Sequence, residues 1–419
     1  MEAEPLLAVL EENWTGAFTK PGPHLYPHQW SWDAGFIAIG WSGHRPARAR
    51  AELRFLLAHQ WPTGMVPHIV FAPGLPESEY FPGPGVWRAG GTSAICQPPI
   101  HATAALAVHR ADHDEDFLAD VVPRLERWHA YLHRDRDPEG TGLPVIRHPW
   151  ESGQDNSPMW DAALAAVQDG SVEPYERSDV GLVHVDERPT VDEYDGYLRL
   201  VAWLRDRGYD EAKIAGQEPF RVVDPLTCAL LVQADHDLAE LTEELGEDPA
   251  PARARAMQTL AAMNERCWSE EHGLYLAHDR VAGALVDAPA AGGLVPLFAG
   301  VPPRERAARM VETLTAAEFW PLGGFPATSF DTARPEFDRA RYWRGPSWVN
   351  VNWLLCRGLR RYGRTSEAEL LRGATLGMID AAGPYEYFDP FDGRGRGSPR
   401  FSWTAALALD LLSDAPPAS

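Results

Sequence analysis

Residues 219–268 read PFRVVDPLTCALLVQADHDLAELTEELGEDPAPARARAMQTLAAMNERCW, and this stretch is the clearest indication of the fold class. Apolar residues recur every three or four positions on both sides of a short polar break. That spacing is typical of amphipathic helices, which bury one side against a core. We therefore predict two helices, at about 219–243 and 250–268, and their short connection makes them an antiparallel pair.

The same periodicity continues through most of the chain. It predicts further helices at about 33–42, 46–59, 100–110, 115–133, 158–168, 191–206, 288–298, 303–316, 347–362, 366–381 and 402–412. The alternation that is typical of half-buried strands is scarce. Pairs of antiparallel helices arranged around a ring form an (α/α)6 barrel, in which inner helices make the core and loops at one end surround a pocket. We predict an all-α fold of this kind.

The domain organisation follows from the linkers. No Pro-rich or Ser-rich stretch divides the chain, so we predict a single domain over residues 1–412 and a frayed tail at 413–419. Loops without helical periodicity are expected at 63–97, 138–156, 169–189, 320–344 and 382–401. Loops of this length are uncommon in compact domains and are usually functional, so we expect a binding site among them.

Two helix starts are marked by side chains that cap a helix. Thr190 and Glu193 stand three residues apart before an apolar run, which is the pattern of a capping box. Ser157 precedes Pro158, and this pair places an N-cap serine before a proline at the first helical position. Both signals predict that a long loop ends where a helix begins.

Charge and cysteine usage exclude several classes of protein. The chain of 419 residues carries a formal net charge of −22, which disfavours binding to nucleic acids and anionic membranes. The four cysteines form no C-x-x-C pair, so neither a disulfide framework nor a zinc site is expected, in keeping with a reducing compartment. The first residues lack the pattern of a signal peptide, and no apolar stretch approaches about 18 residues. A cytoplasmic protein is expected.

Residues 26–36, YPHQWSWDAGF, form the first cluster that carries chemistry. The chain has 16 tryptophans, and two of them, Trp30 and Trp32, stand just before Asp33 at an expected helix start. An Asp in that place serves as an N-cap in many helices. The density of aromatic residues, with Tyr26 close by, favours a second interpretation, in which indole planes cover a sugar ring and the carboxylate accepts its hydroxyl hydrogens.

Residues 150–161, WESGQDNSPMWD, form the second cluster. Acidic and amide side chains precede a helix N-terminus, and Gly153 permits a sharp turn. The positive potential of a helix end favours ionised carboxylates, whereas burial against tryptophan favours protonated ones. Asp155 can act as a general acid only if the second effect is the larger.

Two further clusters lie in the C-terminal third. Residues 341–353, RYWRGPSWVNVNW, place Trp343 and Arg344 in a Gly-Pro turn, where side chains often face a cleft. Residues 385–390, YEYFDP, set Glu386 between two tyrosines, ahead of a glycine-rich stretch and of Trp403. Backbone can approach a ligand closely at glycine, so this loop is also a candidate binding segment.

Glycoside hydrolysis needs two carboxyl groups, and Asp155 and Glu386 provide such a pair from widely separated aromatic segments. One protonates the leaving oxygen while the other acts on the opposite side of the sugar. The sequence contains no G-x-S-x-G elbow, P-loop, dinucleotide fingerprint or H-E-x-x-H motif. Its i,i+4 histidine pairs lack an evident third ligand, so no metal and no cofactor is expected.

The four motifs, in this order and over about residues 26–412, resemble those of glycoside hydrolase family 63. In length, the chain is similar to the short bacterial members of that family, which hydrolyse mannosylglycerate or glucosylglycerate. The resemblance implies an (α/α)6 barrel and an inverting mechanism, with Asp155 as general acid and Glu386 as general base. It also implies that Asp33 holds sugar hydroxyls. The candidate substrate-binding residues are Tyr26, Trp30, Trp32, Asp33, Tyr80, Gln97, Arg188, Trp343, Arg344 and Trp403.

The substrate is left open by the sequence. A glycerate carboxylate requires a cation or hydrogen-bond donors, for which Arg188, Arg88 and Tyr80 are the candidates. The sequence does not separate a mannosyl from a glucosyl substrate. The alternatives are a trehalase-like α-glucosidase that acts on neutral disaccharides, a sugar epimerase on the same barrel, and an inactive carbohydrate-binding protein. The expected partner is a small glycoside, and the sequence is compatible with a homo-oligomer.

Overall fold

The structure is a computed structural model that describes residues 1–168, 170 and 172–414. The described α-helices are α1 (Ala3–Asn13), α2 (Ser31–Ser42), α3 (Pro46–Ala58), α4 (Pro84–Trp87), α5 (His101–Ala111), α6 (Glu115–Asp135), α7 (Asp161–Ala165), α8 (Val191–Asp206), α9 (Glu211–Ile214), α10 (Pro225–Glu244), α11 (Ala250–Arg266), α12 (Arg304–Thr315), α13 (Val349–Arg361), α14 (Thr365–Ala382) and α15 (Ser402–Ser413). The 3-10 helices are η1 (Glu77–Glu79), η2 (Pro149–Ser152), η3 (Pro158–Trp160), η4 (Val185–Glu187) and η5 (Ala291–Leu297).

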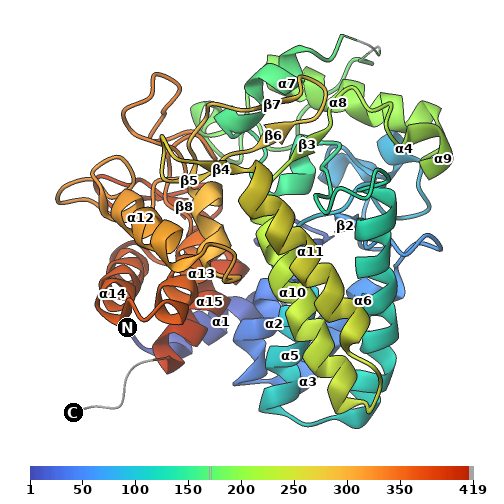
Figure 1. Cartoon of the computed structure of the whole chain (residues 1–419). Coiled ribbons are helices and arrows are strands. Elements are labelled where there is room, and N and C mark those ends of the chain that lie inside the picture. The colour runs from blue at the N-terminus through green and yellow to red at the C-terminus, as the bar shows by residue number, and fades with distance from the viewer. Residues whose placement is uncertain (169, 171, 415–419) are drawn as a thin grey trace.

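The strands are short and antiparallel. They are β1 (Gln29–Trp30), β2 (Ile69–Val70), β3 (Val222–Val223), β4 (Trp268–Ser269), β5 (Leu274–Tyr275), β6 (His278–Asp279), β7 (Ala284–Leu285), β8 (Tyr387–Phe388) and β9 (Gly395–Arg396). They pair as β1–β2, β3–β6–β7, β4–β5 and β8–β9. Figure 1 shows β3, β6 and β7 with α4, α7, α8 and α9 gathered at one end of the helices.

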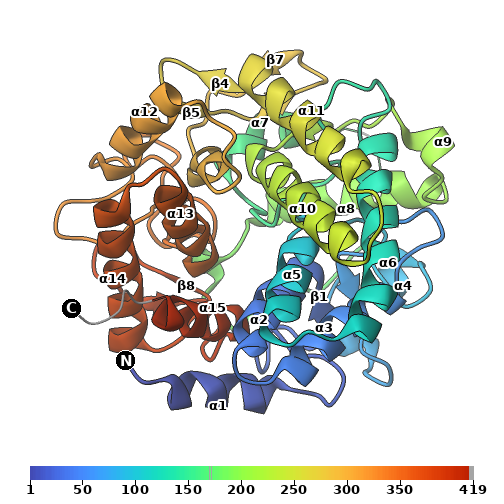
Figure 2. The same cartoon turned by 60° about the horizontal axis from the view of Figure 1, so that its bottom comes forward.

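The helices form two concentric rings, which makes the fold an (α/α)6 barrel. The inner ring runs α2, α5, α10, η5, α13 and α15, and α15 packs against α2 to close it. The outer ring packs α3 on α2, α6 on α10, α11 on α10, α12 on η5, α14 on α13 and α1 on α15 (Figure 2). The inner helices are buried on nearly all sides, because they contact both the axis and the outer ring. The predicted fold class is confirmed.

One inner position departs from the predicted helix at 288–298. The chain there is η5, a 3-10 segment, and its glycines and proline explain the change. A side chain on Gly293 would meet the Tyr275 carbonyl oxygen at 2.1 Å, and one on Gly292 would meet Gln154 at 2.7 Å. Pro296 has no N–H to donate within a helix. Close packing therefore replaces a regular α-helix at this point.

Other helix boundaries also differ from the prediction. The helix expected at 158–168 is divided into η3 and the short α7. The helix α1 was not predicted, although its Leu6, Val9 and Leu10 are buried. The capping box is confirmed, since Thr190 and Glu193 exchange hydrogen bonds at the start of α8. Within the described residues, none of the helices is long and apolar enough to cross a membrane. The predicted tail lies mostly outside the described residues.

Candidate active site

A narrow cavity of about 60 Å³ brings together residues from the N-terminal, middle and C-terminal parts of the chain. Three carboxylates line it, those of Asp33, Asp155 and Glu386. The aromatic side chains of the lining are Tyr26, Trp30, Trp32, Tyr80, Trp150, Tyr194, Tyr342, Phe401 and Trp403. An aromatic surface with a few polar groups suits the two faces of a sugar ring.

Glu386 is the carboxylate with the most hydrogen-bond donors. The Tyr26 hydroxyl donates to Oε1 at 2.6 Å, the backbone N–H of Ser398 donates to Oε2 at 3.0 Å, and Arg188 Nη1 lies 3.7 Å from Oε1. Burial raises the pKa of Glu386 above its ordinary value, and Arg188 and these donors oppose the shift without cancelling it. Donors and a cation favour the ionised form, so the surroundings of Glu386 suit a base.

The loop beside Glu386 is shaped by a glycine. Gly397 has φ +67°, and a side chain there would meet Glu386 Oε2 at 2.5 Å. Glycine alone combines this conformation with the close approach. The glycine-rich segment after Glu386 therefore lets the chain fold back so that Ser398 can donate to the carboxylate.

Asp155 is surrounded differently. It lies in the turn that follows η2, and the Tyr197 hydroxyl donates to its backbone oxygen at 2.9 Å. No other described residue donates a hydrogen bond to its carboxyl oxygens. Although the side chain is partly exposed, desolvation raises the pKa of Asp155 to about 7; Arg188 opposes this shift and Glu386 adds to it. An acid with this pKa is about half protonated at pH 7 and mostly protonated below it, so a general acid is available up to neutral pH.

The turn before Asp155 depends on Gly153. Its φ of +68° is left-handed, and a side chain there would approach Trp32 to 2.4 Å. The glycine thus lets the backbone of the second aromatic cluster touch the indole of the first. This contact joins two walls of the cavity, because Trp32 and Gly153 both line it.

Asp33 lies inside α2 rather than at its cap. The helix begins at Ser31, so the interpretation of Asp33 as an N-cap is wrong. Its side chain lines the cavity and is 4% exposed. Burial raises its pKa well above the ordinary value, and the charges of Glu386 and Asp155 add to this shift. A buried carboxyl group that lines a cavity can bind sugar hydroxyls.

Gln97 connects this first turn of α2 with the loop before α5. Its Oε1 accepts a hydrogen bond from the backbone N–H of Trp32 at 3.1 Å. The side chain lines the cavity and is 4% exposed. Because its amide oxygen accepts this hydrogen bond, the amide of Gln97 has a fixed orientation from which it can contact a ligand.

Arg188 contributes a positive charge to the lining. Its guanidinium donates to the Tyr26 hydroxyl at 3.1 Å and to Asp179 at 3.0 Å, and it lies 4.3 Å from the centre of the Tyr342 ring. Arg88, by contrast, is the exposed C-cap of α4 and lies outside the lining. Of the two arginines proposed for a substrate carboxylate, the structure brings Arg188 to the cavity.

Two other predicted residues lie outside the lining. Trp343 is buried behind it, stacked on Trp348 with ring centres 3.8 Å apart. Arg344 forms an ion pair with Asp161 at 2.7 Å and contacts Glu193. The residue of this turn that lines the cavity is Tyr342, and its backbone φ of +42° is uncommon for a residue other than glycine. The remaining predicted residues, namely Tyr26, Trp30, Trp32, Asp33, Tyr80, Gln97, Arg188 and Trp403, all line the cavity.

The sequence reasoning missed His68, Tyr194 and the role of Trp150 and Tyr342 as lining residues. Burial lowers the pKa of His68 to about 3, so its imidazole is neutral. His68 comes directly before β2; the backbone N–H of Ser31 donates to its carbonyl oxygen at 2.9 Å, and its ring is stacked on that of Trp150 with centres 6.3 Å apart. A lone histidine in a loop has no local signal, whereas Trp150 and Tyr342 stood within the aromatic clusters.

Among the described residues, no group of three or more His, Cys, Asp or Glu is placed to hold a metal ion.

Comparison with known proteins agrees with this geometry. The domain family described as "Mannosylglycerate hydrolase MGH1-like glycoside hydrolase domain" matches residues 26–404. The chain is 46% identical to a mannosylglycerate hydrolase from Rubrobacter radiotolerans, over 96% of this chain and 95% of that protein. It is 34% identical to a glucosylglycerate hydrolase from Mycolicibacterium hassiacum, over 96% of each protein.

A crystal structure with a similar fold is that of a glycoside hydrolase family 63 mannosylglycerate hydrolase from Thermus thermophilus, in complex with Tris and D-glycerate. The TM-score is 0.93 at 41% sequence identity, and the match covers 98% of this chain and 99% of the other. The likeness therefore extends over the whole barrel and its loops.

Proposed function

Because this chain belongs to the family of mannosylglycerate hydrolase MGH1-like glycoside hydrolases, we propose that it hydrolyses the glycosidic bond of mannosylglycerate or glucosylglycerate, with inversion at the anomeric carbon. The chain is a glycosidase. Hexose and glycerate are the products of this reaction. The names of the relatives support both sugars, since mannosylglycerate and glucosylglycerate hydrolases are each similar to it.

The observation that carries the mechanism is the unequal supply of donors to two carboxyl groups of one cavity. Glu386 receives hydrogen bonds from Tyr26 and Ser398, whereas no other described residue donates to the carboxyl oxygens of Asp155. Protonation states are set by such differences in environment. We assign Asp155 as the general acid and Glu386 as the general base.

In the proposed reaction, Asp155 gives its proton to the glycosidic oxygen as the bond to the anomeric carbon breaks. Glu386 accepts a proton from a water molecule, whose oxygen attacks that carbon from the opposite face. Glycerate leaves with the proton of Asp155, and the sugar keeps the water oxygen. Asp155 and Glu386 then exchange protons with solvent to restore the starting state.

The other lining residues hold the substrate. Asp33 and Gln97 have polar atoms suited to sugar hydroxyls, and Trp30, Trp32 and Trp403 provide flat surfaces for the ring. These residues bind and orient the sugar so that the anomeric carbon lies between the two catalytic carboxyl groups. We assign Trp343 and Arg344 to the support of this wall, since they lie behind or beside the lining.

We assign Arg188 to the glycerate carboxylate. The lining includes its guanidinium, and Tyr80 stands in the same cavity with a hydroxyl for a further hydrogen bond. A guanidinium binds a carboxylate through two parallel hydrogen bonds, which is stronger than a contact with a neutral hydroxyl. Arg188 also lies 3.7 Å from Glu386, so Arg188→Ala should slow both kinds of substrate, but it should reduce kcat/KM for a glycosylglycerate by about 30-fold more than for a neutral glycoside of the same sugar. Equal losses would remove Arg188 from this role.

The test of the function is a hydrolysis panel of mannosylglycerate, glucosylglycerate, trehalose and a kojibiose-type disaccharide. We expect turnover of at least one glycosylglycerate at kcat/KM at least 100-fold above the neutral disaccharides. Proton NMR of the fresh reaction should show the anomer opposite in configuration to the substrate. Preference for trehalose would reject the glycerate assignment, and retention of configuration would reject the inverting mechanism.

The alternatives have less support. An epimerase on this barrel would use a pair of histidines for proton transfer, while the described lining of the cavity includes one, His68. An inactive binding protein would lack one of the two catalytic carboxyl groups, and both line the cavity. The small glycoside is the supported partner. A cytoplasmic location, the lack of a nucleic-acid partner and a homo-oligomeric state stay predictions.

A further inference from the structure

A buried ion pair lies beside the active-site cavity, between Glu151 and Arg136. The guanidinium donates two hydrogen bonds to the carboxylate, from Nη1 at 2.7 Å and from Nη2 at 2.6 Å. The Glu151 side chain is 0% exposed and that of Arg136 is 3% exposed. Arg136 follows the end of α6, and Glu151 lies in η2. The pair therefore ties an outer helix to the segment that leads to Asp155.

The same carboxylate also accepts hydrogen bonds from two backbone N–H groups. That of Arg147 donates to Oε2 at 2.6 Å, and that of Cys96 donates to Oε1 at 3.1 Å. Three segments that are distant in sequence thus meet at one side chain: the end of α6, the loop before α5, and the loop of the second aromatic cluster. Removal of the carboxylate would release all three contacts at once.

Each of the two loops carries cavity residues next to this junction. Gln97 directly follows Cys96, and Trp150 directly precedes Glu151. Asp155 comes four residues after Glu151, beyond the tight turn at Gly153. Since Gln97 accepts a hydrogen bond from Trp32, the junction also reaches the first turn of α2. The junction therefore links the segment of the acid to segments that hold the sugar.

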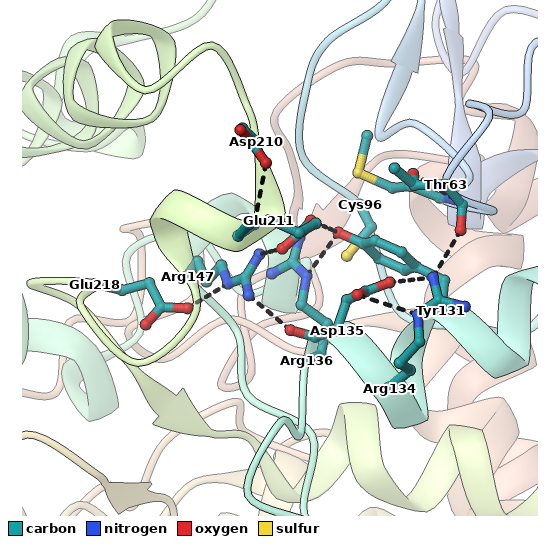
Figure 3. A network of polar contacts seen from close by, with 12 residues as sticks. Thr63, Cys96, Tyr131, Arg134, Asp135, Arg136, Arg147, Asp210, Glu211 and Glu218 are labelled. Carbon is teal, nitrogen blue, oxygen red and sulfur yellow. Dashed lines mark hydrogen bonds and ion pairs between the residues drawn. The ribbon is translucent and has the colours of Figure 1, made fainter.

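The guanidinium of Arg136 belongs to a larger polar network (Figure 3). Arg136 also donates to the Tyr131 hydroxyl at 3.0 Å, which donates to Glu211 at 2.6 Å. Glu211 is paired with Arg147, whose guanidinium forms a second ion pair with Glu218 at 2.6 Å. This arrangement restrains the guanidinium of Arg136 from its far side, so the position of Glu151 is set by more than one contact.

Stability alone is a weak reason for such a pair. The desolvation of two charges offsets most of their attraction, and apolar replacements of buried pairs are often neutral or stabilising. What directional hydrogen bonds supply is a defined geometry, and catalysis is sensitive to displacements of about 1 Å. Burial would raise the pKa of Glu151, but Arg136 and the backbone donors lower it to about 2. The junction therefore stays ionised while Asp155 gains and loses its proton.

We propose that Glu151, held by Arg136, is a positioning residue for the general acid: it sets where Asp155 stands relative to the sugar bound by Gln97 and Asp33. This inference rests on the proposed function. Its distinguishing consequence concerns the leaving group, because a displaced acid matters only when the leaving oxygen needs a proton. Departure of a leaving group that is stable as an anion places a smaller demand on the acid.

The experiment compares Glu151→Gln with the wild-type enzyme on two substrates, the glycosylglycerate and the α-glycosyl fluoride of the same sugar. We expect kcat for the glycosylglycerate to fall by about 30-fold or more, with KM within about 3-fold. For the fluoride, kcat should fall by less than about 3-fold. Equal losses on both substrates would overturn the positioning role, since a general loss of structure affects both reactions alike.

The matched control is Asp235→Asn, which removes a buried carboxylate of α10 that is paired with His129 and Arg255. Within the described part of the chain, Asp235 makes no hydrogen bond or ion pair with the network of Glu151 and Arg136 or with a cavity residue, so both substrates should react within about 3-fold of wild type. A loss there that is confined to the glycosylglycerate would also overturn the proposal. Far-ultraviolet circular dichroism and thermal melting establish that each variant is folded.

If Glu151→Gln does not fold, Arg136→Lys is compared with the wild-type enzyme on the same two substrates. Lysine keeps the charge but cannot make both guanidinium hydrogen bonds. We expect kcat for the glycosylglycerate to fall by about 5- to 10-fold, again with the fluoride spared; a loss of equal size on the fluoride counts against the proposal. Failure of the wild-type enzyme to hydrolyse the glycosylglycerate would reject the proposed function itself, whereas an unselective loss in a variant rejects the positioning role alone.

Discussion

At the scale of single residues, two carboxyl groups of the site differ in the hydrogen-bond donors that surround them. Glu386 is met by a tyrosine hydroxyl, a backbone N–H and a nearby guanidinium, while Asp155 is desolvated without a comparable set. Desolvation favours the neutral form of a carboxyl group, and donors favour the anion. This difference supports the opposite tasks that we propose for the two groups, although their chemistry is the same.

Asp155→Asn tests the acid role directly. An amide cannot donate a proton to the leaving oxygen, so kcat for a glycosylglycerate should fall by about 10²- to 10⁴-fold, and KM should change little because the shape is kept. Initial rates over a range of substrate concentrations provide both constants. The control is Asp192→Asn, since Asp192 is exposed in the first turn of α8. Activity of Asp155→Asn above a tenth of wild type would contradict the assignment.

The pH dependence has a definite sign. The pKa of Asp155 is raised to about 7, so the acid is protonated below that pH and ionised above it. Because the reaction needs its proton, kcat/KM for the glycosylglycerate should decline as the pH rises through about 7. Rates measured from about pH 5 to 9 at constant ionic strength check this. A rate that increases between about pH 7 and 9 would show that a different group is the acid.

At the scale of elements, the helices with strong periodicity were predictable and the irregular ones were not. The pair α10 and α11 and the start of α8 follow from apolar spacing and from capping side chains, which are local properties. The segment η5 has the same apolar character, but its glycines and proline serve close packing against neighbours that are distant in sequence. Local periodicity contains no information about such neighbours.

The turn at Gly153 is the element on which the position of Asp155 depends. Gly153→Ala would place a methyl group 2.4 Å from the Trp32 ring, at a left-handed φ of +68°. We expect kcat/KM to fall by about 100-fold, because the acid and the sugar-binding wall must both shift. Steady-state kinetics and thermal melting measure the effect.

Gly140→Ala is the matched control for this turn. Gly140 has a similar φ of +64°, but no atom lies within 4 Å of the added methyl group. Both variants bear the strain of a left-handed residue, about 1–2 kcal/mol, and only Gly153→Ala should also lose activity. Loss of activity in both variants would mean that backbone strain, rather than contact with Trp32, is responsible.

At the scale of the whole molecule, the site exists only when the ring closes. The helix α15 packs against α2 and α1, which joins the two ends of the chain. The hydrogen bond from Tyr26 to Glu386 spans 360 positions in the sequence. A base held in this way cannot be prepared by any local segment, so we expect folding and the formation of the active site to occur together.

The reactivity of the four cysteine thiols can be used to follow the closure of the helical ring. Cys96, Cys228, Cys267 and Cys356 are free and buried, and burial raises the pKa of each thiol. A buried neutral thiol reacts slowly, so the native protein should show essentially no reaction with a thiol reagent. In rising urea concentration, all four should become reactive in the transition that circular dichroism reports. Exposure of some thiols in an earlier transition would contradict the predicted single domain.

Local sequence was enough to predict the helical class and the barrel, and to indicate Asp155 and Glu386 as candidate acids, because apolar period, capping residues and acid–aromatic clusters are properties of neighbouring positions. Which member of each cluster reaches the cavity depended on the folded chain, which places Tyr342 there where Trp343 was predicted. The fold also pairs Arg344 with Asp161 and gives the donors to Glu386 rather than to Asp155. The physical reason is that burial, hydrogen bonding and pKa depend on partners brought together by folding, and these partners lie far away in the sequence.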